Sequence, residues 1–157
     1  RMTESEAQVL HIRLQQDDQW PPFDCEEVLG EPEGERRYRL LTAPAFARRL
    51  AVGDVVTAHR DSTGWLWIDG VVQRGDHSTV RVLVRRAEAE SGLSAALDAQ
   101  GCRVSSSPLP DLLVVDVPGP VDYAAVRALL EEGERQGDWE YQEAAISLHH
   151  DRMTLIP

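Results

Sequence analysis

Residues 74–84 have the sequence RGDHSTVRVLV, and the organisation of the whole chain can be worked out from this stretch. Val80, Val82 and Val84 alternate with Arg81 and Leu83, a pattern that predicts a β-strand with one buried face. The polar residues before it separate this strand from a second strand-like run at 65–72. We therefore expect the strand that starts at Val80 to lie between an antiparallel N-terminal region and a C-terminal region of different character.

The C-terminal region alternates between helical and extended patterns. Five elements are expected after the first strand, in the order helix, strand, strand, helix and strand, at 87–100, 102–105, 112–117, from 122 onward and at 139–146. Gly101 ends the first helix and Asp122 caps the second. The order β-α-β-β-α-β predicts a ferredoxin-like subdomain over 80–148, with residues 149–157 as a tail.

The N-terminal region, residues 1–79, contains short strand patterns and no helical one. Strands are expected at 8–14, 25–30, 37–41, 55–59 and 65–72. A hairpin turn at 61–64 joins the last two, and Pro44 makes residues 43–47 a crossing segment rather than a strand. Antiparallel strands at such short spacing predict a small curled sheet or partial barrel, so the chain as a whole is expected to be an α+β protein.

Composition excludes several classes of function. The chain has 157 residues, a formal net charge of -11, and sixteen basic residues that are all arginine. Without lysine there is no Schiff-base lysine and no phosphate-loop lysine. No basic segment is rich enough to bind a phosphate backbone, so nucleic acid is not an expected partner. The lack of lysine and asparagine, which use A-rich codons, is typical of a GC-rich bacterial genome.

The two cysteines, Cys25 and Cys102, are too far apart for a CxxC motif or a zinc framework. We expect them to be reduced thiols in a cytoplasmic protein. No apolar run is long enough to span a membrane, and no signal peptide precedes the first strand, so no membrane partner is expected. The sequence predicts no cofactor, and it leaves the oligomeric state open.

The segment between the strands at 65–72 and 80–84 is the predicted ligand site. It contains an imidazole, two hydroxyls, a carboxylate and two guanidinium groups, and the residues are Arg74, Asp76, His77, Ser78, Thr79 and Arg81. Hydroxyls and turn N–H groups can hold an oxyanion, and an arginine can add a bidentate contact. Trp65 and Trp67 share one strand face and could add an aromatic wall. The sequence thus predicts an accessory or binding protein for a peptide or a small anionic ligand.

Two other functions are compatible with these residues. In a small tailoring enzyme of the hydrolase or cyclase type, His77 would be the general base, Ser78 or Cys25 the nucleophile, and Arg81 the support for the oxyanion. In an acidic inhibitor or immunity protein, the negative surface would cover a basic protein partner. No metal site is predicted, because the adjacent ligands His149, His150 and Asp151 chelate poorly without others.

Five short motifs, taken in order, resemble the bacterial domain-of-unknown-function family 4265. They are Trp20-Pro-Pro22, Pro44-Ala-Phe46, Val52-Gly-Asp-Val-Val56, Gly75-Asp-His-Ser-Thr-Val-Arg81 and Val121-Asp-Tyr123. The resemblance implies no activity, cofactor or catalytic residue. It does imply that the family pattern favours the residues Gly53, Asp54, His77, Ser78, Thr79 and Arg81.

Overall fold

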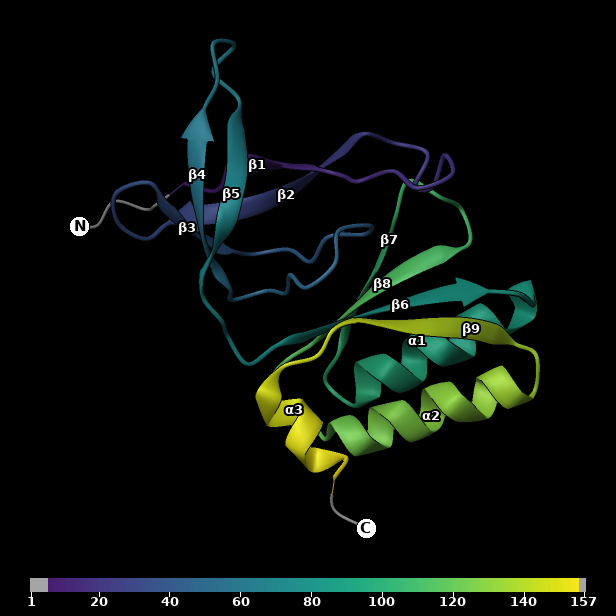
Figure 1. The fold of residues 1–157 in the computed structure, drawn as a ribbon. Coiled ribbons are helices and arrows are strands. Elements are labelled where there is room, and N and C mark those ends of the chain that lie inside the picture. Colours follow the sequence, from purple (N-terminus) through teal and green to yellow (C-terminus); the bar gives the residue numbers. More distant parts are fainter. Residues whose placement is uncertain (1–5, 156–157) are drawn as a thin grey trace. The chain divides into compact units, whose positions relative to one another are not determined.

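A computed structural model of the chain describes residues 6–155. The chain divides into two compact units, Arg1–Gly75 and Asp76–Pro157, whereas the predicted boundary follows Thr79. Both units contain antiparallel strand pairs and the second adds helices, which confirms the predicted α+β class (Figure 1). Within residues 6–155, no helix has the length and apolar character needed to cross a membrane.

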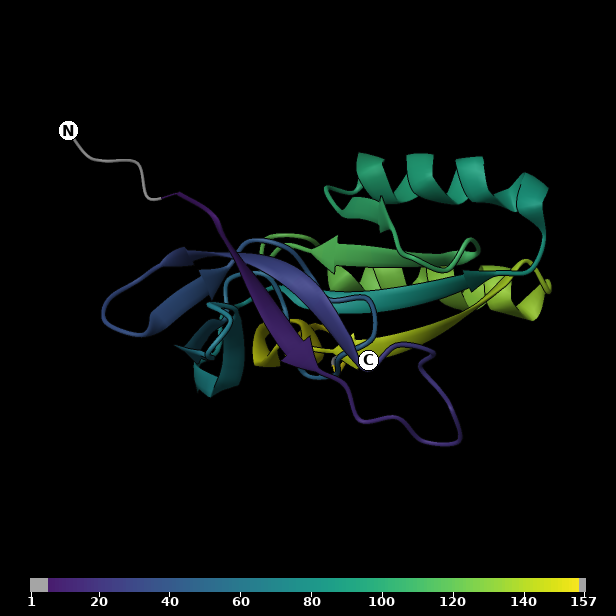
Figure 2. The same cartoon turned by 90° about the horizontal axis from the view of Figure 1, so that it is seen from above.

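Unit 1 is a closed barrel of five strands. The strands are β1 (Gln8–Arg13), β2 (Cys25–Pro32), β3 (Arg37–Leu40), β4 (Val55–Arg60) and β5 (Leu66–Gln73). Consecutive strands pair antiparallel, and Figure 2 shows β1 and β2 side by side. The barrel closes where β1 pairs in parallel with β5 at Leu10–Leu66 and His11–Trp67. The sequence predicts only a curled sheet or partial barrel, because a parallel pairing between the first and last strands leaves no local signal.

Alternation along the strands separates the barrel interior from its outer face. Leu10, Val28, Leu40, Val56 and Leu66 each come from a different strand, and none is more than 4% exposed. Their strand neighbours point outward, because successive side chains of a strand lie on opposite faces. The outward face therefore carries whatever polar and aromatic residues the sequence places between the core positions.

A glutamate from β2 holds the crossing segment 43–47 against the barrel. The carboxylate of Glu26 accepts hydrogen bonds from the N–H groups of Ala45, Phe46 and Ala47, at 2.8, 2.9 and 2.6 Å. These donors have no strand partner, because Pro44 interrupts any regular ladder. The carboxylate thus accepts the hydrogen bonds that a neighbouring strand would accept in a sheet.

Unit 2 is a four-stranded antiparallel sheet in the order β7-β8-β6-β9, with two helices on one face (Figure 1). Its elements are β6 (Ser78–Val84), the 3₁₀ turn η1 (Ala87–Ala89), α1 (Glu90–Ala99), β7 (Arg103–Ser106), β8 (Leu112–Val117), α2 (Tyr123–Arg135), β9 (Trp139–Ala145) and α3 (Leu148–Met153). Val80, Val82 and Val84 pack in one core cluster with Leu97 and Leu130 of the helices. The predicted alternation in β6 therefore does mark its helix-covered face.

The predicted tail from residue 149 contains the helix α3. Ser147 caps it, its side chain accepting a hydrogen bond from the N–H of His150 at 3.1 Å. His150 has no exposed surface. The capping Ser147 and the buried ring of His150 hold α3 in place. The polar composition of this segment does not predict an ordered helix.

Candidate functional site

The predicted loop is divided between the two units, and its first residues are anchored in the barrel. The carboxylate of Asp54, which is 2% exposed, accepts hydrogen bonds from the N–H of Gly75 at 2.8 Å and from Arg74 at 3.2 Å. Arg74 also donates to the carbonyl of Arg49. These contacts bring the motifs around Gly53 and Gly75 together, and they use Arg74 to hold the end of β5.

Glycine is favoured at both positions of this contact. Gly53 has φ of 90°, a conformation that L side chains rarely adopt. A Cβ atom on Gly75 would lie 3.0 Å from the carbonyl carbon of Gly53, closer than ordinary contacts allow. The two glycines therefore let the backbone of residues 53 and 75 approach, which explains their place in the sequence motifs without a ligand.

In unit 2, His77 meets a carboxylate that the sequence analysis does not single out. Nδ1 of His77 lies 2.7 Å from Oδ1 of Asp116, and the two side chains are 25% and 11% exposed. Asp116 comes from β8, next to Thr79 in the antiparallel register. When the ring is neutral, an Nδ1–H donated to the carboxylate leaves Nε2 as the acceptor, the geometry of a general base held by an orienting acid.

Ser78 points away from His77 and belongs to a different network. Its hydroxyl lies 2.6 Å from Nδ1 of His150 and accepts the N–H of Ser147 at 2.9 Å. Nε2 of His150 lies 3.0 Å and 3.2 Å from the carbonyls of Pro118 and Gly119, so Nε2 carries the hydrogen and Ser78 donates to Nδ1. Ser78 is fully buried and engaged, and the structure does not pair it with His77 as nucleophile and base.

Burial lowers the pKa of His150 below its ordinary value of 6.5. The neutral ring therefore contributes stability that is complete above about pH 6.5 and is lost as the pH falls through the lowered folded-state pKa. We expect the free energy of unfolding to fall between pH 7.5 and pH 5, with a shallower slope in His150→Gln than in the parent chain. Urea unfolding at both pH values measures this, with the exposed His149→Gln as control. Equal slopes in the parent and His150→Gln would contradict the assignment.

The remaining loop residues take other places in unit 2. Thr79 has no exposed surface, and Arg81 is 7% exposed on the sheet face opposite the valines of β6. The carboxylate of Asp76 lies where a side chain on Gly119 would be, 2.2 Å from the position of its Cβ. Of the predicted loop residues, His77 and Asp76 are the ones in unit 2 with accessible side chains.

The described residues include no group of potential metal ligands, and both cysteine thiols have raised pKa values. Between residues 6 and 155, no three or more His, Cys, Asp or Glu side chains are grouped so that they could hold a metal ion. Burial raises the pKa of the Cys102 thiol to about 11 and also raises that of Cys25. Both thiols are therefore protonated at neutral pH and poorly nucleophilic.

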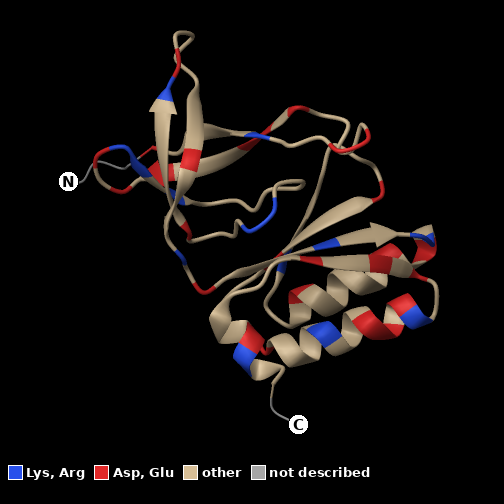
Figure 3. Cartoon of the chain, viewed as in Figure 1, with Lys and Arg blue, Asp and Glu red and all other residues tan. Residues whose placement is uncertain are grey.

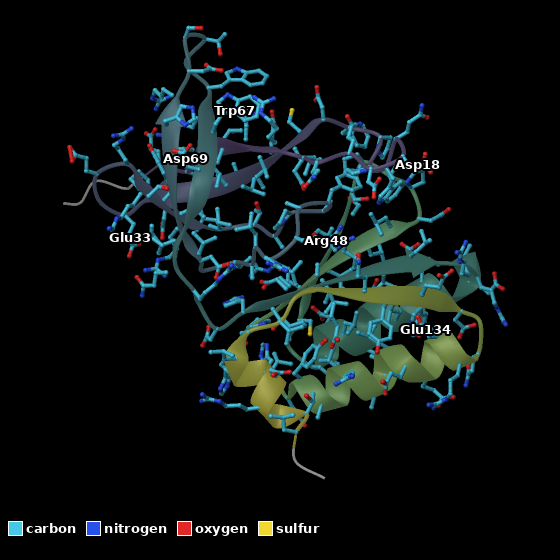
Figure 4. The ribbon with its side chains drawn as sticks, in the orientation of Figure 1. Asp18, Glu33, Arg48, Trp67, Asp69 and Glu134 are labelled. Atoms are coloured by element: carbon cyan, nitrogen blue, oxygen red, sulfur yellow. The ribbon has the colours of Figure 1, made fainter. Side chains whose placement is uncertain are left out.

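The predicted aromatic residues form an ordered cluster on the outer face of the barrel (Trp67 is labelled in Figure 4). The ring of His11 stacks on Trp65 with centroids 4.0 Å apart and planes at 13°, and it lies 5.4 Å from Trp67. The guanidinium carbon of Arg13 lies 4.3 Å from the centre of the Trp67 ring. We call these four residues the aromatic face.

The aromatic face is far from the anchored end of the loop within unit 1. Trp67 is at the start of β5, and Arg74 follows the end of that strand, seven residues later. At about 3.3 Å per residue, an extended strand places the two roughly 20 Å apart. The tryptophans and Arg74 therefore do not share one ligand site in the barrel.

Asp116 and His11, the partners of His77 and Trp65, were not predicted from the sequence. Asp116 is the single charged residue in the strand LLVVDV, and a carboxylate in an otherwise aliphatic buried strand is a signal for a buried pair. His11 occupies an outward position in β1, but its stacking on Trp65 depends on the closure of the barrel. Charge gives no further indication, because acidic residues occur on elements of both units (Figure 3).

Comparison with known proteins agrees with the sequence motifs. The sequence model of the family "Domain of unknown function (DUF4265)" matches residues 26–141. The chain belongs to this family. Within DUF4265, the matched range includes Asp54, His77, Asp116 and both tryptophans of the aromatic face, whereas His11 and His150 lie outside it.

A solved structure shares the fold of this DUF4265 protein. It is a "hypothetical protein from Neisseria gonorrhoeae", with a TM-score of 0.76 and 18% sequence identity over 94% of this chain and 99% of that chain. A search of the curated proteins gives no match. The comparisons thus show the family and the fold, and they assign no function.

Proposed function

We propose that the chain is a small binding protein that recognises a peptide, and that the aromatic face of the barrel is its recognition surface. The observation that carries this proposal is the exposed indole of Trp65 on its buried support. Trp65 is 49% exposed, whereas His11 beneath it is 4% exposed. Large aromatic side chains that stay half exposed on a fixed support are typical of binding surfaces.

The face is preorganised, which favours binding. Trp67 donates its indole N–H to the carboxylate of Asp61 at 2.8 Å, and Arg13 covers its ring. Asp61 also accepts the backbone N–H of Trp65 at 3.1 Å, so one carboxylate holds the Trp67 indole and the backbone of Trp65. Side chains that are ordered before the ligand arrives lose little entropy when it binds.

Exposed apolar side chains of β1 and β2 extend the surface beyond the aromatic face. Val9 and Leu29 face each other across β1 and β2 and are 44% and 39% exposed. With Trp65 they form an exposed apolar row, and side chains of an extended peptide could rest on it. The loop residues offer less, because Arg74 and Ser78 are already hydrogen-bonded within the fold.

We infer that unit 2 is a ferredoxin-like subdomain. Its element order β-α-β-β-α-β and its strand order β7-β8-β6-β9 support this assignment. The buried polar networks of His150 and Asp116 then serve mainly to hold strands and helix α3 in place.

The proposal predicts that peptide binding depends on Trp65. A phage-displayed library of linear heptapeptides is panned against the full chain, and the affinity of selected peptides is measured by calorimetry. Trp65→Ala should weaken binding about tenfold or more, because truncation of a central aromatic anchor typically costs 2 kcal/mol or above. Val72→Ala is the matched control, since Val72 is also exposed on β5 but lies at the other end of the strand. Failure to enrich any peptide, or an equal loss in both variants, would contradict the proposal.

A further inference from the structure

The register of the barrel places an acidic residue beside the aromatic face. Glu27 of β2 pairs with His11 of β1, and His11 pairs in turn with Trp67 of β5. These three side chains therefore lie in one row on the outer face of the barrel. Glu27 is 66% exposed, so its carboxylate is available at the edge of the aromatic face.

His11 carries a polar atom without a hydrogen-bond partner. Its Nδ1 is buried and makes no hydrogen bond. The nearest carboxylate oxygen, Oε2 of Glu27, lies 3.9 Å away, beyond hydrogen-bond distance. Because Nδ1 lies buried beneath Trp65, the exposed carboxylate of Glu27 is the group of this pair that a ligand can reach.

The other charges of this face already have partners. Nδ1 of His59 lies 2.7 Å from Asp69, Asp61 accepts the indole N–H of Trp67, and Arg13 lies over the Trp67 ring (Trp67 and Asp69 are labelled in Figure 4). Among residues 6–155, the carboxylate of Glu27 is the exposed acceptor of this row, and its nearest ionisable neighbour is the buried ring of His11 at 3.9 Å. The formal net charge of -11 adds a long-range attraction for cations.

We propose that the occupant of the aromatic face is a basic peptide, which deepens and rests on the peptide-binding function proposed above. An arginine or lysine of the peptide lies on the side of the Trp65 indole that His11 does not cover, where the ring attracts a cation. Its N–H groups donate to the exposed carboxylate of Glu27. Neighbouring apolar side chains of the peptide rest on Val9 and Leu29.

The test compares three capped hexapeptides in which leucine alternates with arginine, with its neutral analogue citrulline, or with glutamate. Binding to the full chain is measured by calorimetry at low and at high salt. The arginine peptide should bind about tenfold tighter than the citrulline peptide and lose that advantage at high salt. Glu27→Gln should weaken the arginine peptide about three- to fivefold and leave the citrulline peptide unchanged.

The control is Glu35→Gln, an exposed acid in the turn between β2 and β3. It removes the same charge away from the aromatic face and should change the affinity less than twofold. Citrulline or glutamate peptides that bind as tightly as the arginine peptide, still in a Trp65-dependent way, would overturn the basic occupant and leave the peptide-binding function standing. Arginine-dependent binding that Glu27→Gln and Glu35→Gln weaken equally would also overturn it. If none of the three peptides bound, the basic occupant would be overturned, whereas the peptide-binding function would fail only if the library also yielded no Trp65-dependent peptide.

Discussion

Replacing Glu26 with alanine is expected to destabilise the barrel by about 3 kcal/mol or more. The substitution removes one carboxylate that accepts three consecutive N–H groups, those of Ala45, Phe46 and Ala47. A hydrogen bond to a charged group contributes roughly 1.5–3 kcal/mol, and donors left without a partner add a desolvation penalty. The three contributions are not additive, because the three donors share one carboxylate.

The neighbouring residue provides the control for this prediction. Glu27 lies on the opposite face of β2 and is largely exposed, so Glu27→Ala should change the free energy of unfolding by about 0.5 kcal/mol or less. Glu26→Gln should give an intermediate loss, because its amide keeps only one acceptor oxygen. Urea unfolding followed by tryptophan fluorescence measures all three variants. Similar losses for Glu26→Ala and Glu27→Ala would show that the segment 43–47 does not depend on this carboxylate.

Gly133→Ala is the second change with a large expected effect, and two physical terms oppose each other there. Alanine is favoured over glycine inside a helix by about 1 kcal/mol. At position 133 of α2, however, a Cβ atom would lie 1.9 Å from the ring of Trp139, which is 6% exposed. The indole cannot easily move, because its N–H donates to the carbonyl of Leu130 at 2.9 Å.

We therefore expect overpacking to outweigh helix propensity at position 133. Forcing extra atoms into a packed core typically costs 1–3 kcal/mol and more when a large ring is fixed, so a net loss of about 2 kcal/mol is predicted. Gly92→Ala in α1 is the matched control, because a Cβ there meets no atom within 4 Å. That variant should gain about 0.5–1 kcal/mol. Thermal or urea unfolding measures the change in the free energy of unfolding for both variants. Stabilisation by Gly133→Ala would contradict the packing of Trp139 on α2.

Much of the architecture follows from local patterns. Alternating valines mark β6 and its buried face, and Gly101 and Asp122 mark where one helix ends and the next begins. These signals lie within a few residues of the element that they define, so a single sequence carries them. The α+β class and the family could be predicted on this basis.

The features that could not be predicted from the sequence have a different physical origin. Barrel closure depends on a pairing between β1 and β5, which are more than fifty residues apart along the sequence. The helix α3 depends on the distant residues that bury His150, and Glu26 depends on donors that lie some twenty residues further along the chain. Each of these contacts forms only after the fold has brought distant segments together.

The predicted ligand loop illustrates the same limit at the level of the site. His77 and Ser78 are adjacent, and chemistry alone suggests that they act together. At the entry to a strand, neighbouring side chains point to opposite sides, and here His77 meets Asp116 while Ser78 meets His150. The role of His77 as a general base stays a prediction, supported by its carboxylate partner but without a nucleophile among its hydrogen-bond partners.

The most direct test of the central claim is to locate the bound peptide by NMR. The full chain, labelled with ¹⁵N, is titrated with the capped hexapeptide of alternating leucine and arginine. The aromatic face predicts that the indole signals of Trp65 and Trp67 and the amide signals of His11 and Glu27 shift together. Shifts centred instead on His77, Ser78 and Asp116 would contradict it and return the binding site to the loop.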